Sequence, residues 1–213
     1  MKTTAESKTL RDVPSQVKNP DLIGRRRRQI VDAAVKLFIK KGFHKTTTRE
    51  IARESGISTG LLYEYVSTKE DVLYLVCDAI HAEVESAVAE AVRRVSAGQD
   101  VLTAMIREYF LVCDRMSDHI LLVYQETKAL PPQWRDRVLE NEVKLTNIFV
   151  STLEELALCG ELPLTPRSSL KLIAHNITVL GHMWTFRRWF LSRHFTIEEY
   201  IQRQTDFILG RST

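Results

Sequence analysis

The sequence predicts an all-α protein of about nine helices. Apolar residues recur at helical spacing through most of the chain, beginning with a stripe formed by Ile30, Ala33, Ala34, Leu37 and Phe38. Glycine and proline punctuate these periodic segments, and no alternating β-branched run bounded by turns indicates a sheet. The 213 residues are enough for a sizeable core in one or two domains.

Two short helices are expected after the first one. Thr47 can cap the second helix, because Glu50 lies three residues later at capping-box spacing. Gly56 ends that helix, and Ser58 begins a third that runs to about Val66.

The pattern predicts six further helices in the rest of the chain. The fourth begins near Lys69 and continues to about Val95. The other periodic segments cover residues 100–116, 119–128, 133–158, 167–192 and 196–210. Residues 1–23 have little apolar periodicity and contain two prolines, so we expect a flexible N-terminal tail there.

Charge is divided unevenly along the chain. Residues 1–70 carry 15 Lys and Arg against 8 Asp and Glu, whereas residues 71–213 carry 15 against 19. A basic N-terminal third on a mildly acidic body indicates that one region faces a polyanion and the other does not.

Cysteine usage and hydropathy indicate a cytoplasmic protein. Cys77, Cys113 and Cys159 form no CxxC pair, which argues against a disulfide framework and against a cysteine-based zinc site. They are expected to be small buried residues, and a redox-sensing role for one of them stays open. No uninterrupted apolar run is long enough to span a membrane, and the N-terminal residues lack the apolar segment of a secretion signal.

The second and third helices have the spacing of a helix-turn-helix. Gly56 permits the tight turn, and Ile57 fills the junction between the helices. The first turn of the third helix presents only Thr59 and Gly60, so its backbone can lie deep in a DNA major groove.

The segment TTTREIARESGISTGLLYEYVSTKEDVL (46–73) resembles the DNA-binding segment of the TetR family of bacterial transcriptional regulators. The resemblance covers about residues 24–73. It implies a DNA-binding domain over residues 24–70 and a helical effector-binding and dimerisation domain over residues 71–213.

The resemblance also implies a set of DNA contacts. Phosphate contacts are expected at the start of the second helix, at the end of the third and at the start of the fourth, and base contacts at the start of the third. The residues expected at phosphates are Thr47, Thr48, Arg49, Tyr63, Tyr65 and Lys69. The residues expected at the bases and their flanking backbone are Ser58, Thr59, Gly60 and Leu61. Leu62 is expected to point inward.

Two features beside these contacts can be interpreted in more than one way. Glu64 is an acid near phosphates; it can accept from a cytosine amino group or pair with Arg49. The run Arg25, Arg26, Arg27 and Arg28 is either an arm that touches phosphates or the minor groove, which we favour, or a solvated helix start.

The C-terminal helices carry apolar stripes that suit a dimer. The stripe residues are Leu170, Ile173, Ile177, Leu180, Trp184 and Leu191 in segment 167–192, and Ile197, Tyr200, Ile201, Phe207 and Ile208 in segment 196–210. Two such helices can pair with their copies in a four-helix interface, although periodicity alone also fits an intramolecular core. The family resemblance favours the homodimer, which would read a palindromic operator.

Aromatic and polar residues on apolar faces suggest a tunnel for a small hydrophobic effector. These residues are Tyr109, Cys113, Tyr124, Gln125, Asn147, Phe149, Asn176, Met183 and Trp184, each of which also fits plain core. The segments 124–136 and 181–201 look like parts of TetR-family members that regulate fatty-acid degradation and respond to acyl-CoA. That resemblance implies an acyl chain in the core, with Arg107, Arg187 or Arg188 at the CoA phosphates; a multidrug or aromatic effector is the alternative.

No enzyme is predicted. His175 and His182 lie seven apart on one helix, but the spacing offers no converging third ligand for a metal, and no phosphate loop or hydrolase motif occurs. No cofactor and no metal are therefore expected; a helical metal-dependent enzyme and a structural DNA binder without effector remain the alternatives. The expected function is a dimeric repressor, released when an effector shifts the fourth helix and changes the separation of the two recognition helices.

Overall fold

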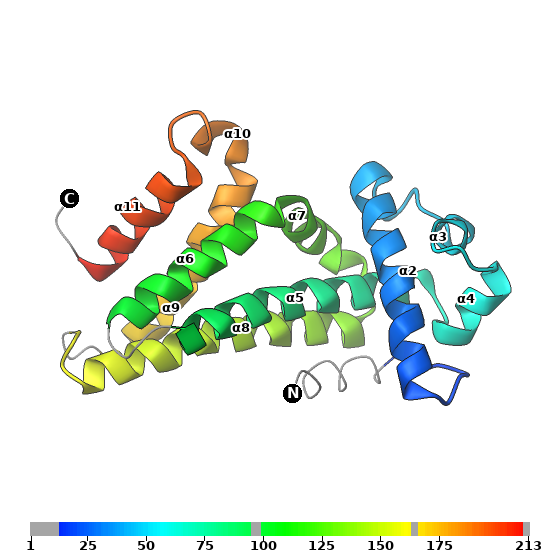
Figure 1. Ribbon diagram of the computed structural model, residues 1–213, viewed down its shortest axis with the longest axis horizontal. Helices are drawn as coiled ribbons and strands as arrows, with labels where there is room; N and C mark the ends of the chain where they lie inside the picture. Colours follow the sequence, from blue (N-terminus) through cyan, green and yellow to red (C-terminus); the bar gives the residue numbers. More distant parts are fainter. Residues whose placement is uncertain (1–12, 95–98, 163–165, 211–213) are drawn as a thin grey trace. The chain divides into compact units, whose positions relative to one another are not determined.

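The computed structural model describes residues 13–94, 99–162 and 166–210 (Figure 1). Over these ranges every regular element is helical, with ten α-helices, nine of them of seven residues or more, and one 3₁₀ turn. The expected all-α fold is confirmed. The elements are α2 (Pro20–Lys41), α3 (Thr48–Glu54), α4 (Thr59–Tyr65), α5 (Lys69–Arg94), α6 (Gln99–Arg115), α7 (Ser117–Glu126), η1 (Thr127–Ala129), α8 (Pro132–Leu158), α9 (Arg167–Phe186), α10 (Arg188–Leu191) and α11 (Ile197–Leu209).

The helix expected over residues 167–192 is wrong in one respect, because two helices occupy it. The backbone of Arg187 leaves helical geometry, with φ −111° and ψ 18°, and α10 starts at the next residue. The guanidinium of Arg188 donates to the backbone oxygen of Asp114 and to Ser117 Oγ, which fixes the chain at this break.

The chain divides into two compact units. The first contains the described residues up to Ala82 and the segment Leu122–Leu139. Its core includes Ile30, Phe38, Ile51 and Leu62, which are at most 2% exposed and come from α2, α3 and α4. The stripe expected on the first helix is therefore the face that α2 presents to the helix-turn-helix.

The second unit contains Glu83–Leu121 and the residues from Glu140 onward. In it α6 packs against α9 and α11. Tyr109, Phe149 and Trp184 lie in its core and are 3% exposed or less. A close approach occurs at Gly181, where a Cβ atom would lie 2.5 Å from Tyr109 Cε1.

The stripes expected at a dimer interface are used mostly inside the protomer. Ile177 and Trp184 on α9, and Tyr200 and Ile201 on α11, are buried in the core of the second unit. Phe207 differs, since it is 80% exposed. Helical periodicity marked the faces of α9 and α11 that α6 covers, so those stripe residues are wrong as the main dimer surface.

The expected tail differs from the structure over its described part. Residues 1–12 lie outside the described residues, but Val13 is 2% exposed and packs within the first unit. Asn19 caps α2 by accepting from the backbone N–H groups of Asp21 and Leu22, so the helix begins at Pro20. Among the described helices, none has both the length and the apolar character that a membrane span needs.

Candidate nucleic-acid interface

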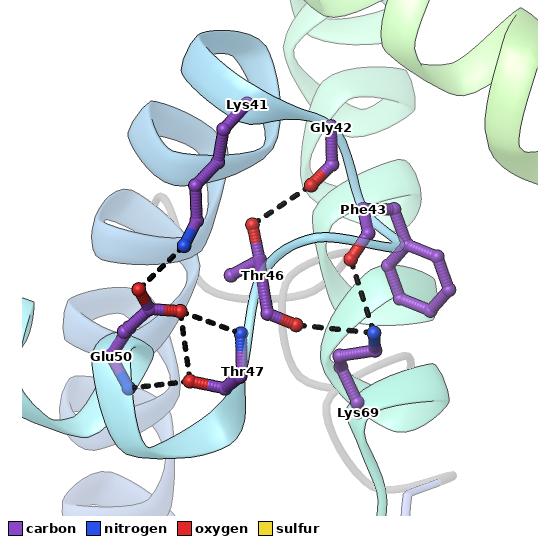
Figure 2. Close-up of polar contacts among 7 residues, drawn as sticks. All are labelled: Lys41, Gly42, Phe43, Thr46, Thr47, Glu50 and Lys69. Atoms are coloured by element: carbon purple, nitrogen blue, oxygen red, sulfur yellow. Dashed lines mark hydrogen bonds and ion pairs between the residues drawn. The ribbon is translucent and has the colours of Figure 1, made fainter.

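The start of α3 is fixed by the expected capping box. Thr47 Oγ1 accepts from the backbone N–H of Glu50 at 3.3 Å, and Glu50 Oε2 accepts from the backbone N–H of Thr47 at 2.9 Å. Glu50 Oε1 also lies 2.6 Å from Lys41 Nζ, at the end of α2 (Figure 2). The hydrogen bond from Lys41, followed by those from Thr47, lowers the pKa of Glu50 to about 2. These contacts hold α3 against the end of α2.

The turn between α3 and α4 has the expected chemistry. Gly56 has φ +68°, a left-handed conformation that L side chains rarely adopt. The backbone N–H of Ile57 then donates to Ala52 O at 3.0 Å. Ser58 caps α4, since its Oγ accepts from Leu61 N at 3.1 Å. The orientation of α4 is therefore set by local hydrogen bonds.

One face of α4 is left open to solvent. Ser58, Gly60 and Tyr63 are exposed, and Thr59 and Leu61 are half-buried, whereas Leu62 is fully buried as expected. A Cβ atom at position 60 would meet only Ser58 Oγ, at 4.0 Å. The first turn of α4 thus presents backbone and small side chains, as a helix that enters a major groove requires.

The flank of this face contains several of the expected phosphate ligands. Thr47 and Arg49 are exposed, and Thr48 is half-buried. The hydroxyl groups of Thr48 and Tyr63 lie 3.0 Å apart, so α3 and α4 present them side by side.

The expectation for Tyr65 is wrong. This side chain is 3% exposed and belongs to the core of the first unit. Tyr65 follows Leu62 by three residues, so both lie on the inward face of α4, while Tyr63 lies on the outward face. Helical spacing could have separated the two tyrosines.

The Lys69 side chain also makes contacts other than the expected one to a phosphate. Its Nζ donates to Phe43 O and Thr46 O, both at 3.1 Å, and lies 4.2 Å from the centre of the Phe43 ring (Figure 2). Thr46 in turn donates from Oγ1 to Gly42 O. Lys69 therefore joins the loop between α2 and α3 to the start of α5.

The four arginines of α2 do not share one environment. Arg25 and Arg28 are exposed, and Arg26 is half-buried and donates to Gln29 Oε1. Arg27 is 1% exposed, and its guanidinium donates to backbone carbonyl oxygens in the first unit. The expectation of a DNA contact is wrong for Arg27, because this position continues the buried stripe of α2 at Ile30 and Ala34.

Glu64 is exposed on α4, and its backbone oxygen accepts two hydrogen bonds. The donors are Ser15 Oγ at 3.0 Å and Gln16 N at 2.9 Å. Within the described residues no hydrogen bond or ion pair joins the Glu64 carboxylate to Arg49. Ser15 and Gln16 were missed from the sequence, where no local pattern marks them as partners of α4.

The residues expected to line a ligand tunnel separate into two groups. Tyr109, Cys113, Phe149 and Trp184 are buried together in the second unit, with Met183 half-buried. Burial raises the pKa of the Cys113 thiol to about 12 and that of Tyr109 well above its ordinary value. Tyr109 Oη donates to Thr178 O at 3.1 Å. These side chains form a packed aromatic core with few polar groups.

The remaining members lie at the surface of their units. The expectation that Tyr124, Gln125, Asn147 and Asn176 face an apolar core is wrong, because all four are exposed; each lies on the outward side of an amphipathic helix.

The three candidate arginines for a CoA phosphate are also exposed, but each has a contact. Arg107 pairs with Glu198, Arg188 lies 3.0 Å from Asp114, and Arg187 lies over the Trp189 ring. Beside Arg188 an open hollow of about 460 Å³ has a wall formed by residues 192–197. Residues 192–196 were not among the expected ligand contacts, since a loop has no periodicity to mark them.

Comparison with known proteins gives a consistent answer. Residues 30–74 match the model of the bacterial regulatory proteins, tetR family. The HTH-type transcriptional regulator HbdR of Aromatoleum sp. (strain CIB) is 28% identical over 89% of this chain and 82% of its own length.

Solved structures share the fold. A regulatory protein of the tetR family from Rhodococcus RHA1 has a TM-score of 0.73 and 25% identity, with 88% of this chain and 96% of that chain covered. FadR of Bacillus subtilis in complex with stearoyl-CoA has a TM-score of 0.69 and 20% identity, with 87% and 99% covered. Together with the helix-turn-helix geometry, these matches identify the chain: it belongs to the TetR family of bacterial transcriptional regulators.

Proposed function

We propose that this regulator is a homodimeric repressor that binds a palindromic operator through α4 and is released by a small hydrophobic effector, a fatty acyl-CoA. The observation that carries the DNA-binding part is the exposed first turn of α4, where Gly60 leaves the backbone uncovered. Thr59 and Leu61 beside it have the chemistry to meet a base edge and a thymine methyl group. Thr47, Thr48, Arg49 and Tyr63 flank this turn with donors for phosphates.

The domain division that we propose follows from this assignment. Residues 24–70 make the DNA contacts, and residues 71–213 bind the effector and form the dimer. Arg25 and Arg28, both exposed on α2, supply further cations for the backbone of the operator.

A second copy of the chain is proposed to cover α9. Leu172 is 59% exposed and Val179 38% exposed, and their spacing of seven residues places them on one face of α9. His175 and Asn176 lie between them on the same exposed face. A stripe with apolar ends and polar residues between them suits an isologous contact, in which α9 meets its own copy.

The proposal of an acyl-CoA effector has two supports. The FadR structure, which shares the fold, contains stearoyl-CoA. In this chain, the aromatic core around Tyr109 and Trp184 offers an apolar environment, and exposed Arg187 and Arg188 offer cations for phosphates. The packed rings require side chains to move before an acyl chain enters. An aromatic effector would need the same movement, so a ligand screen has to distinguish the two classes.

Release is proposed to act through the geometry of the dimer. Two recognition helices bind both half-sites only when their separation matches the spacing of the half-sites, one helical turn of DNA or a multiple of it. The effector is proposed to bind more tightly to a dimer whose recognition helices do not match the operator, and so to shift the population toward that conformation. The factor by which the effector lowers operator affinity is then also the factor by which the operator lowers effector affinity.

Tyr63→Ala tests the DNA-binding part. It removes the phenol hydroxyl next to Thr48 from an exposed position, so the fold and the dimer should survive. We expect operator affinity to fall by more than about ten-fold, the loss expected for one removed hydrogen bond to a charged phosphate. Tyr124→Ala is the matched control, because Tyr124 is 67% exposed and lies outside the helix-turn-helix. Wild-type affinity of the Tyr63 variant would reject the proposed face.

The effector is tested by thermal shift with acyl-CoAs of graded chain length. A bound ligand raises the unfolding temperature in proportion to the logarithm of its concentration above Kd. We expect stabilisation that depends on chain length and is absent with free CoA. Stabilisation by aromatic compounds alone would reject the acyl-CoA and leave the repressor.

A further inference from the structure

A buried carboxylate joins α8 to the loop that follows the recognition helix. Asp71, in the first turn of α5, is 6% exposed. Its Oδ2 accepts from the backbone N–H groups of Ser67 at 3.0 Å and Thr68 at 2.9 Å. Its Oδ1 accepts from Trp134 Nε1 at 3.0 Å. One side chain of α8 thus shares the carboxylate that holds the loop between α4 and α5.

Trp134 is itself held firmly in the first turn of α8. The side chain is 8% exposed, and its ring stacks on Tyr74 of α5, with centres 4.3 Å apart and planes 17° apart. Its backbone N–H donates to Pro131 O. A stacked ring allows little rotation, so a displacement of this turn of α8 moves the indole N–H with it.

The other end of the same loop is held by a buried cation. Arg27 donates to Tyr65 O, the backbone oxygen of the last residue of α4, from Nε at 3.1 Å and from Nη2 at 2.8 Å. Arg27 Nη2 also donates to Val13 O at 2.6 Å. Burial lowers the pKa of Arg27, and the charge of Asp71 opposes that effect. The backbone on either side of Val66 is therefore fixed by two buried, opposite charges.

These contacts make the end of α4 sensitive to α8. A hydrogen bond to a buried charge is among the stronger single interactions in a protein, and its loss leaves the charge less well solvated. Without the indole N–H, Asp71 would turn toward another donor and loosen the loop at Ser67 and Thr68. From Glu140 onward α8 belongs to the second unit, so this helix is shared between the two units.

We propose that Trp134 is a positioning residue for operator binding, and that its hydrogen bond to Asp71 lets the first turn of α8 control the loop that follows α4. The proposal rests on the proposed function, since it takes α4 as the recognition helix. Trp134 itself touches no DNA in this scheme.

Trp134→Phe is the test in the full chain, because phenylalanine keeps a ring on Tyr74 and removes the N–H. Trp189→Phe is the matched control, since Trp189 is 61% exposed in the second unit. Two readouts are needed: affinity for a duplex that the wild-type protein selects from a random pool, and amide exchange at Ser67 and Thr68. For Trp134→Phe we expect operator affinity to fall about ten-fold and the two amides to exchange about ten-fold faster, with no change in the control.

A purely structural role would lower the unfolding temperature and leave operator affinity unchanged well below it. That result overturns the proposal, as does weaker DNA binding with unchanged exchange at Ser67 and Thr68. If the wild-type protein selects no duplex, the proposed function fails, and the exchange readout alone decides whether Trp134 holds the loop. Should Trp134→Phe not fold, Trp134→Leu, which also removes the N–H and leaves Asp71 and its bonds to Ser67 and Thr68 in place, replaces it with the same readouts.

Discussion

Gly60→Ala separates two reasons for a glycine in the first turn of α4. The protein itself has room for the methyl group, because its nearest neighbour would be Ser58 Oγ at 4.0 Å. Position 60 is helical, so alanine should stabilise the fold by about 0.5–1 kcal/mol through helix propensity and a less flexible unfolded chain. DNA gives the opposite expectation, since a methyl group on the exposed backbone would hold the helix away from the base edges. We expect operator affinity to fall by about ten-fold or more, or about 1.4 kcal/mol.

Urea unfolding measures the first effect, and fluorescence anisotropy with a selected duplex measures the second at one fixed salt concentration. Ala79→Gly is the control: Ala79 is exposed in the middle of α5, so this variant should lose stability and keep its DNA affinity. If Gly60→Ala is more stable and binds DNA as tightly as the wild type, the backbone of α4 does not approach the bases and the reasoning is refuted.

Three further variants test other parts of the structure. Arg27→Met should lower the free energy of unfolding by about 3 kcal/mol or more, because backbone oxygens lose a buried donor. Arg28→Met, at an exposed position, is the control and should change it by less than about 0.5 kcal/mol. Urea unfolding measures both. Gly181→Ala should destabilise the second unit by about 1–3 kcal/mol, seen by near-UV circular dichroism during thermal unfolding, because the new Cβ would lie 2.5 Å from the buried Tyr109 ring. Glu50→Gln should lower the unfolding temperature at neutral pH. The extra stability of the wild type is present above the ordinary carboxyl pKa of 4.5 and is lost as the pH falls toward about 2. A difference in unfolding temperature that does not change with pH would contradict the role of the Glu50 charge.

Local chemistry accounts for the success of the sequence analysis in the helix-turn-helix. A capping box, a left-handed glycine and a serine cap each act over three or four residues, so the pattern Thr47, Glu50, Gly56 and Ser58 determines α3 and α4 without distant help. The inward position of Leu62 follows from the same short-range spacing.

At two positions helical periodicity predicts burial better than residue type does. Arg27 precedes Ile30 by three residues and Ala34 by seven, which places it on the buried stripe of α2 despite its charge. Tyr65 follows Leu62 by three residues and is buried for the same reason. In both cases the residue type suggested the surface, and the spacing indicated the core.

Other features had no local signal in the sequence. Asp71 and Trp134 are 63 residues apart, and only the packing of the segment Leu122–Leu139 within the first unit brings them together. Likewise, periodicity marked the stripes of α9 and α11 as apolar faces but could not say whether α6 or a second copy covers them. Asn147 is exposed although it was expected in a core. A polar residue next to apolar ones in the sequence can lie on either the buried or the exposed face of a helix.

The cations with partners inside the first unit also change how the basic N-terminal third should be interpreted. Its surplus of cations suggested a broad polyanion-binding surface, yet Arg27 and Lys69 donate to backbone oxygens and Lys41 pairs with Glu50. Each phosphate that a protein neutralises adds about 0.9 to the slope of the logarithm of affinity against the logarithm of salt concentration. Cations that hold loops add nothing to this slope, so the salt dependence of operator binding should be set by exposed residues such as Arg28 and Arg49. The basic residues of this region thus divide into two groups: Arg27, Lys41 and Lys69 hold the helix-turn-helix together, and exposed residues such as Arg28 and Arg49 are the ones that we propose to meet the DNA.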